Sequence, residues 1–152
     1  MILCGDTIRA RCKEMGLIIP FVEKTERNGL SFGLSYAGYD IRVVQTLLLN
    51  PGDFVLASSL EHFDMPLDLI AQVTDKSTWA RVGIAVQNTV IEPGWKGHLT
   101  LEITNHSRKI IEIKNGDPIA QILFTFLDKP VDRGYAGKYQ NQENKPVPAI
   151  FE

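Results

Sequence analysis

The chain has 152 residues, of which 44% are hydrophobic and 22% are charged, and its formal net charge is −2. This composition is that of a globular protein, and the length is enough for one domain with a buried core. No apolar run approaches the ~20 residues that span a bilayer, and Lys and Arg are scattered among Asp and Glu. We therefore expect one domain over residues 1–152 that binds neither a membrane nor a nucleic-acid polymer.

The first segment has a helical pattern. Ile8, Cys12 and Met15 lie at positions i, i+4 and i+7. A glycine follows, so we predict a short helix over residues 6–16. Cys4 and Cys12 cannot form a zinc site alone, and we interpret both as partly buried core residues. The chain start lacks the layout of a signal peptide, which predicts a cytoplasmic protein, or one of the host cytoplasm if a virus encodes it.

Short apolar or alternating runs follow, separated by turns such as Asn50-Pro51-Gly52-Asp53, and none has a helical pattern. Many short strands with frequent tight turns indicate a mainly β domain, a distorted and jelly-roll-like β-barrel preceded by the short helix. The expected strands lie within residues 17–23, 39–44, 46–49, 53–59, 69–75, 82–92, 98–105, 109–114 and 119–127.

Residues 128–152 differ from the rest, because they are polar, rich in Pro, Gly, Asn and Gln, and lack a core pattern. One interpretation is a frayed terminus. The other is a flexible C-terminal arm that closes over a ligand and carries Tyr135, Lys138 and Gln142 as donors.

The segment 75–83, DKSTWARVG, gathers two cations, two hydroxyls and several backbone amides. Polyphosphates bind to such donors. A capped turn with an arginine that reaches to solvent explains the segment equally well. The chain has no glycine-rich loop of the Walker type, which excludes a P-loop mechanism.

Three acidic residues are candidates for a site. Glu102 lies on the strand face opposite Leu99, Leu101 and Ile103, so it is either a solvated charge or a carboxylate held in a cleft. Glu92 opens a Pro-Gly turn that it could simply cap. The third, Asp40, is two residues before an arginine, and we interpret this pair as a structural ion pair.

A zinc deaminase is disfavoured because the three histidines lie in different segments and no P-C-x-x-C motif is present. We predict no metal site made by the protein itself. Any metal is expected to be Mg²⁺ that arrives with the phosphates of a nucleotide.

Five motifs in order, SYAGYDIRV, DKSTWARVG, VIEPGWKGHLTLEITN, NGDPIAQILF and GKYQNQ, resemble the superfamily of trimeric dUTPases and dCTP deaminases. Two of them resemble the deaminase branch: the tail motif GKYQNQ, and the glutamate in TLEITN that dUTPases lack. The resemblance runs nearly from end to end and implies a dUTPase-like fold, a homotrimer with sites at subunit interfaces, and a deoxycytidine nucleotide substrate.

The implied reaction is the zinc-independent hydrolytic deamination of dCTP to dUTP and ammonia. The resemblance makes Glu102 the general base and proton shuttle. Ser77 and Arg81 match the residues that orient the water and offset charge on the ring. Further residues are implied to bind substrate: Lys76, Thr78, Lys138 and Gln142 at the phosphates, Thr89 and Glu92 in the hairpin at the base, and Tyr135 in the arm.

The chain departs from the deaminase pattern in its hairpin, since residues 87–92 are two residues shorter than usual and resemble the dUTPase version. Glu92 also stands where both branches generally have Asp, and the tail is shortened, with Tyr135 as the substitute for an earlier tyrosine. These departures keep two alternatives open: a nucleoside triphosphate pyrophosphohydrolase of the dUTPase type, and a bifunctional enzyme. A non-catalytic regulator is a third alternative, which the retained Ser77, Arg81 and Glu102 disfavour.

Overall fold

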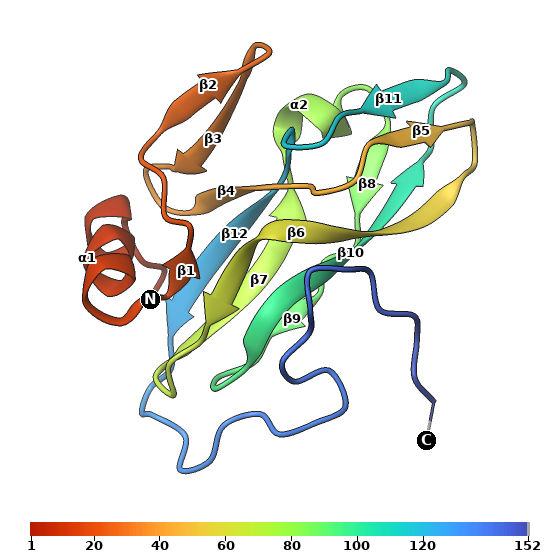
Figure 1. Ribbon diagram of the computed structural model, residues 1–152. Coiled ribbons are helices and arrows are strands. Elements are labelled where there is room, and N and C mark those ends of the chain that lie inside the picture. Colours follow the sequence, from red (N-terminus) through yellow and green to blue (C-terminus); the bar gives the residue numbers. More distant parts are fainter. Residues whose placement is uncertain (152) are drawn as a thin grey trace.

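The computed structural model describes residues 1–151 and is mainly β, as predicted (Figure 1). Two curled antiparallel sheets face each other and enclose the core. The strands are β1 Ile18–Ile19, β2 Thr25–Arg27, β3 Leu30–Leu34, β4 Tyr39–Arg42, β5 Leu47–Leu49, β6 Phe54–Asp64, β7 Leu69–Asp75, β8 Ile84–Val86, β9 Val90–Ile91, β10 Lys96–Asn105, β11 Ile111–Ile113 and β12 Pro118–Phe126.

Each sheet brings together strands that are far apart in the sequence. One sheet has the order β1-β6-β10-β8 and the other β2-β3-β4-β12-β7-β9, while β5 and β11 form a separate pair. The long strands β6 and β10 pair along most of their length, from Lys96 opposite Asp64 to Thr104 opposite Phe54. Strand β10 is therefore paired with β6 along the stretch that contains Glu102.

The predicted helix is confirmed as α1, Gly5–Met15. Gly16 ends it in the left-handed conformation with φ of 68°, which glycine adopts without steric cost. Ile8 and Cys12 are buried against the core, but Cys4 is exposed at the helix start, so its predicted burial is wrong. Cys4 is the N-cap residue of α1 and lies just outside the first helical turn.

The structure also contains a second helix that the sequence analysis excluded. It is α2, Ser77–Ala80, a single turn between β7 and β8. Four residues are too few to show a 3.6-residue apolar repeat, and none of them is buried. The hairpin of β2 and β3 was likewise not predicted, because the three residues of β2 are all exposed and show no alternation.

The last segment leaves β12, passes below the ends of the sheets and turns back in front of β10 (Figure 1). It is held by backbone hydrogen bonds, from the Tyr135 amide to the Pro93 carbonyl at 2.7 Å and from the His98 amide to the Gln142 carbonyl at 3.0 Å. Residues 128–151 thus dock on the protein as an arm. Neither helix within residues 1–151 is long and apolar enough to cross a membrane.

Candidate functional site

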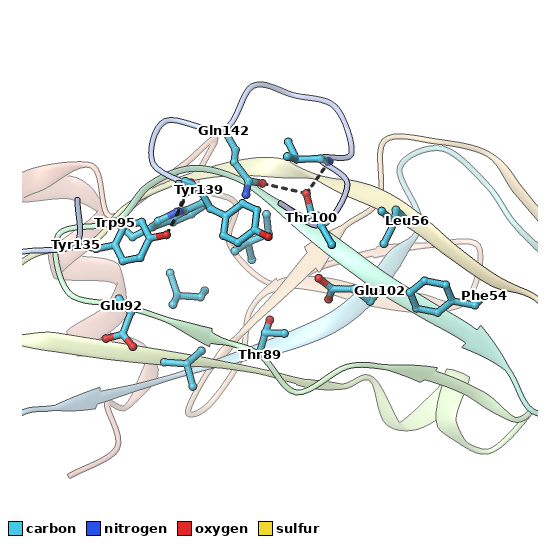
Figure 2. A pocket seen from close by; sticks show the side chains of 15 residues that line it. Phe54, Leu56, Thr89, Glu92, Trp95, Thr100, Glu102, Tyr135, Tyr139 and Gln142 are labelled. Carbon is cyan, nitrogen blue, oxygen red and sulfur yellow. Dashed lines mark hydrogen bonds between the residues drawn. The ribbon is translucent and has the colours of Figure 1, made fainter. Parts of the chain in front are cut away.

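A cavity with a volume of about 550 Å³ lies between β10, β9 and the arm (Figure 2). We call it the Glu102 pocket. Its walls are mostly apolar and aromatic, and no Lys or Arg among residues 1–151 lines it. The lining residues are Phe54, Leu56, Thr89, Val90, Ile91, Glu92, Trp95, Leu99, Thr100, Glu102, Tyr135, Tyr139, Gln142, Val147 and Ala149.

Strand β10 positions Glu102 by simple alternation. Leu99, Leu101 and Ile103 are buried, whereas Thr100 and Glu102 are half-buried on the opposite face. This face meets the pocket, so of the two interpretations of Glu102 the structure supports a carboxylate at a cleft.

The Glu102 carboxylate is held in an environment that opposes its charge. Its Oε2 atom is buried, and it is the one such side-chain polar atom without a hydrogen-bond partner among residues 1–151. Burial raises the pKa of Glu102 above its usual value, because the charged form loses its hydration. An unpaired carboxylate of raised pKa is suited to accept a proton and pass it on.

The arm forms one wall of the pocket and is held by contacts with the start of β10 and the residue before it. Trp95 donates its indole Nε1–H to the Tyr139 carbonyl at 2.7 Å. Gly97 has φ of 141°, and a Cβ there would lie 2.6 Å from the Gln142 amide nitrogen. Only glycine allows this close approach, so the sequence of β10 itself sets where the arm lies.

Three residues of the arm were predicted to bind substrate. Tyr135 and Gln142 line the Glu102 pocket, and Thr100 donates its hydroxyl to Gln142 Oε1 at 3.0 Å. Lys138 does not line the pocket: its Nζ donates to the Ile150 carbonyl and lies 5.6 Å from the Tyr139 ring centre.

The donor segment around α2 lies outside the Glu102 pocket. Its tryptophan, Trp79, donates Nε1–H to the Pro118 carbonyl at 2.6 Å, and the Asp75 carboxylate accepts from the Val86 amide at 2.7 Å. These contacts fix the turn from both sides. Ser77, Thr78 and Arg81 are exposed on it, and within residues 1–151 Arg81 has no ion-pair partner. The arginine is thus available to a group from outside the chain.

Lys76 is buried at the start of this segment. Its Nζ lies 2.9 Å from Asp40 Oδ2, with side chains only 8% and 9% exposed. Burial raises the pKa of Asp40, and the lysine opposes that effect. Lys76 and Ser77 line a small cavity of about 250 Å³ with Asp40 and Ser31.

The structural ion pair predicted between Asp40 and Arg42 is wrong in its partners. Arg42 binds Glu61 instead, with Nε donating to Oε1 at 2.8 Å, and the Arg42 amide donates to Oε2 of the same carboxylate. Glu61 is fully buried on β6. Asp40 and Arg42 are therefore both in structural ion pairs, but Asp40 pairs with Lys76 and Arg42 pairs with Glu61.

The predicted site residues fall into two groups. Five of them share the Glu102 pocket: Thr89, Glu92, Glu102, Tyr135 and Gln142. The others lie elsewhere: Lys76, Ser77, Thr78 and Arg81 around α2, and Lys138 on the arm.

Sequence reasoning missed several walls of the Glu102 pocket, namely Trp95, Tyr139, Phe54 and Leu56. Two of these stood in quoted motifs, Trp95 in VIEPGWKG and Tyr139 in GKYQNQ. Phe54 and Leu56 gave no signal, because on their own strand they resemble ordinary core residues.

The chain offers no metal cage in the part that the structure describes: within residues 1–151 no three His, Cys, Asp or Glu side chains come together to hold an ion. Residues with free hydroxyl, amide and guanidinium donors instead suit the oxygens of phosphate groups. A Mg²⁺ ion fits such a site when the phosphates supply its ligands.

Comparisons with known sequences agree with this geometry. The family described as dCTP deaminase-like matches residues 37–127. The dCTP deaminase of Campylobacter curvus is 35% identical over 178 aligned positions that cover 95% of this chain and 96% of the relative. The dCTP deaminase of the Wolbachia of Brugia malayi is 33% identical over 176 positions, with 94% and 95% covered. Since this chain has only 152 residues, these relatives contain stretches that it lacks.

Solved structures show the same fold. EIAV dUTPase superposes with a TM-score of 0.58 at 20% identity, over 76% of this chain and 91% of the dUTPase. The dUTPase of phage phi11 of S. aureus has a TM-score of 0.57 at 19% identity, over 74% and 88%. A mutant of the phage enzyme is described as coordinating a structural Mg(II) ion. With its dUTPase-like fold and its family match, this chain belongs to the dCTP deaminase-like family.

Proposed function

We propose that the protein is a dCTP deaminase, which hydrolyses dCTP to dUTP and ammonia with Glu102 as general base. The observation that carries the proposal is the unpaired, half-buried Glu102 carboxylate at the wall of a nucleotide-sized pocket. The names of the relatives at 33–35% identity support the substrate.

In the proposed reaction, Glu102 takes a proton from a water molecule as the water oxygen attacks the ring carbon that bears the amino group. The carbon–nitrogen bond then breaks, and the proton passes from Glu102 to the departing ammonia. The apolar walls favour this role because they destabilise the charged carboxylate and make it a stronger base.

The Glu102 pocket contains only part of the groups that the reaction needs. A triphosphate is strongly anionic, yet in the part of the chain that the structure describes no cationic side chain lines this pocket. Ser77 and Arg81, which would orient the water and offset the charge on the ring, are exposed on α2 instead. We therefore propose a homotrimer in which α2 of a neighbouring copy completes each site.

The mouth of the pocket supports such an assembly. Phe54 is 57% exposed and Val90 51% exposed there. Large apolar side chains at the rim of a pocket are typical of a surface that a partner covers.

In the complete site, Thr78 would hold phosphates from α2, and Lys138 and Gln142 would do so from the arm. Lys76, which is buried and paired with Asp40, would hold the start of α2 in place beside the phosphates. Mg²⁺ would come with the triphosphate and neutralise part of its charge. Thr89, Glu92 and Tyr135 would surround the base and sugar. This activity on a free nucleotide would take place in the cytoplasm.

A bifunctional enzyme that also releases pyrophosphate is the second candidate. Glu92 lies in the same pocket as Glu102 and comes from a hairpin with only two strand residues, Val90 and Ile91. A second carboxylate could position water at the phosphates.

Product analysis tests the proposal. Purified protein with Mg²⁺ is given dCTP or dUTP, and ammonia, pyrophosphate and nucleotides are separated by chromatography. Ammonia and intact dUTP from dCTP support the deaminase. Ammonia with pyrophosphate and dUMP supports the bifunctional enzyme. Pyrophosphate from dUTP with no ammonia from dCTP would overturn the proposed deaminase.

A further inference from the structure

We propose that Thr100 is a positioning residue that orients the Gln142 amide so that its NH₂ group faces the nucleotide. Thr100 lies two residues before Glu102 on the same face of β10. The inference rests on the proposed function for the identity of the nucleotide. The contacts that support it are those between Thr100 and the arm.

Thr100 joins two points of the arm through one hydroxyl group. The Val147 amide donates to Thr100 Oγ1 at 3.0 Å. Thr100 Oγ1 in turn lies 3.0 Å from Gln142 Oε1 (Figure 2). Both contacts are half-buried, so water competes with them less than it would at the surface.

The Thr100 hydroxyl group accepts one of these hydrogen bonds and donates the other. A backbone N–H can only donate, so Thr100 is the acceptor toward Val147 and keeps its own proton to donate. The side-chain carbonyl oxygen of Gln142, Oε1, accepts the hydrogen bond from the Thr100 hydroxyl and so faces Thr100. The two N–H bonds of the Gln142 amide are left for the pocket, and Nε2 makes no hydrogen bond within residues 1–151.

The backbone of Gln142 does not need Thr100 to stay in place. Its carbonyl accepts from the His98 amide at 3.0 Å, and Gly97 packs against its nitrogen. What remains free at this residue is the rotation of the side-chain amide. Thr100 removes that freedom and selects the orientation that offers donors rather than an acceptor to phosphate or carbonyl oxygens.

Thr100→Val removes the hydroxyl group and preserves the shape, Thr100→Ser restores the hydroxyl group, and Thr104→Val is the control. Thr104 is on the same face of β10, two residues beyond Glu102, and its hydroxyl makes no hydrogen bond within residues 1–151. We expect T100V to raise the KM for dCTP about tenfold, the effect of ~1.4 kcal/mol in binding, while kcat stays within about twofold. T100S and T104V should behave like the parent protein.

Hydrogen exchange of the Val147 amide gives a second readout that needs no activity. T100V should lose protection at Val147, and T100S should keep it. Retained protection in T100V overturns the inference, as does a KM that is unchanged in T100V or equally raised in T104V. If the parent protein protects Val147 but releases no ammonia from dCTP, the proposed function fails. The Thr100 inference is then decided by the exchange data and by calorimetric binding of dCTP.

Discussion

The Glu102 pocket and the α2 segment, residues 75–83 around α2, differ in chemical character. The pocket is apolar and encloses a carboxylate with one unpaired oxygen, and none of the cationic side chains that the structure describes lines it. The α2 segment is polar, and its charges are either compensated, as in Lys76 with Asp40, or exposed to solvent, as in Arg81. Neither region alone could both bind a triphosphate and deaminate its base. This difference supports the proposal that another copy of the chain completes each site.

Replacing Glu102 with Gln should produce the largest effect. The amide cannot accept the proton of the attacking water, so we expect kcat for dCTP to fall by about a thousandfold. Calorimetric binding of dCTP should change little. Glu112→Gln, at an exposed position of β11, is the control. Deamination that survives E102Q would assign the base to another residue.

Mixing two inactive variants tests the division of the site. In an assembly whose sites combine Glu102 of one copy with Arg81 of another, unfolding and refolding E102Q together with R81A should restore about a quarter of the parental activity, as random assortment gives. Sites within single chains would stay inactive in the mixture. Each variant refolded alone provides the baseline.

Replacing Asp40 with Asn should lower the stability of the protein through the α2 segment. It leaves the buried Lys76 ammonium without its counter-charge, which costs about 3 kcal/mol of the free energy of unfolding. Urea denaturation measures the loss. Adding K76M to D40N should recover part of it, whereas D132N at an exposed position should have almost no effect. Equal stability of D40N and the parent protein would show that the ion pair is not structural.

Replacing Gly97 with Ala should loosen the arm on the pocket side. The new Cβ would meet the Gln142 nitrogen at 2.6 Å, so we expect the arm to detach and the KM for dCTP to rise about tenfold. Gly52→Ala is the matched control, because Gly52 has φ of 83° but no atom within 4 Å of an added Cβ. Similar KM values in G97A and G52A would mean that the arm contact does not matter for binding.

The smallest expected effect concerns stability and pH. Burial raises the pKa of Glu102 above 4.5 in the folded state, so the folded protein binds this proton more tightly than the unfolded chain does. Its stability is therefore penalised as the pH rises through the folded pKa. E102Q should raise the Tm by a few degrees at pH 8, and the gain should shrink toward pH 4.5. A Tm difference independent of pH would contradict this.

The fold could be predicted further than the site. Alternation in β10 placed Glu102 opposite the buried leucines, and the spacing of Ile8 and Cys12 gave α1 to within one residue. The short elements could not be predicted, since α2 has four residues and β2 has three, and neither shows an apolar repeat. Cys4 was misplaced because burial at a helix start depends on what packs there.

The sequence by itself determined the strand pattern, the first helix and the family, because these depend on local periodicity and on the order of motifs. Only the tertiary structure decided that the face of Glu102 is covered by the arm, that Lys76 pairs with Asp40 and that α2 lies away from the pocket. The first two depend on contacts between residues more than 30 positions apart, and the third on which segments line the pocket. Such contacts are set by how the sheets and the arm pack together, and local propensity does not encode them.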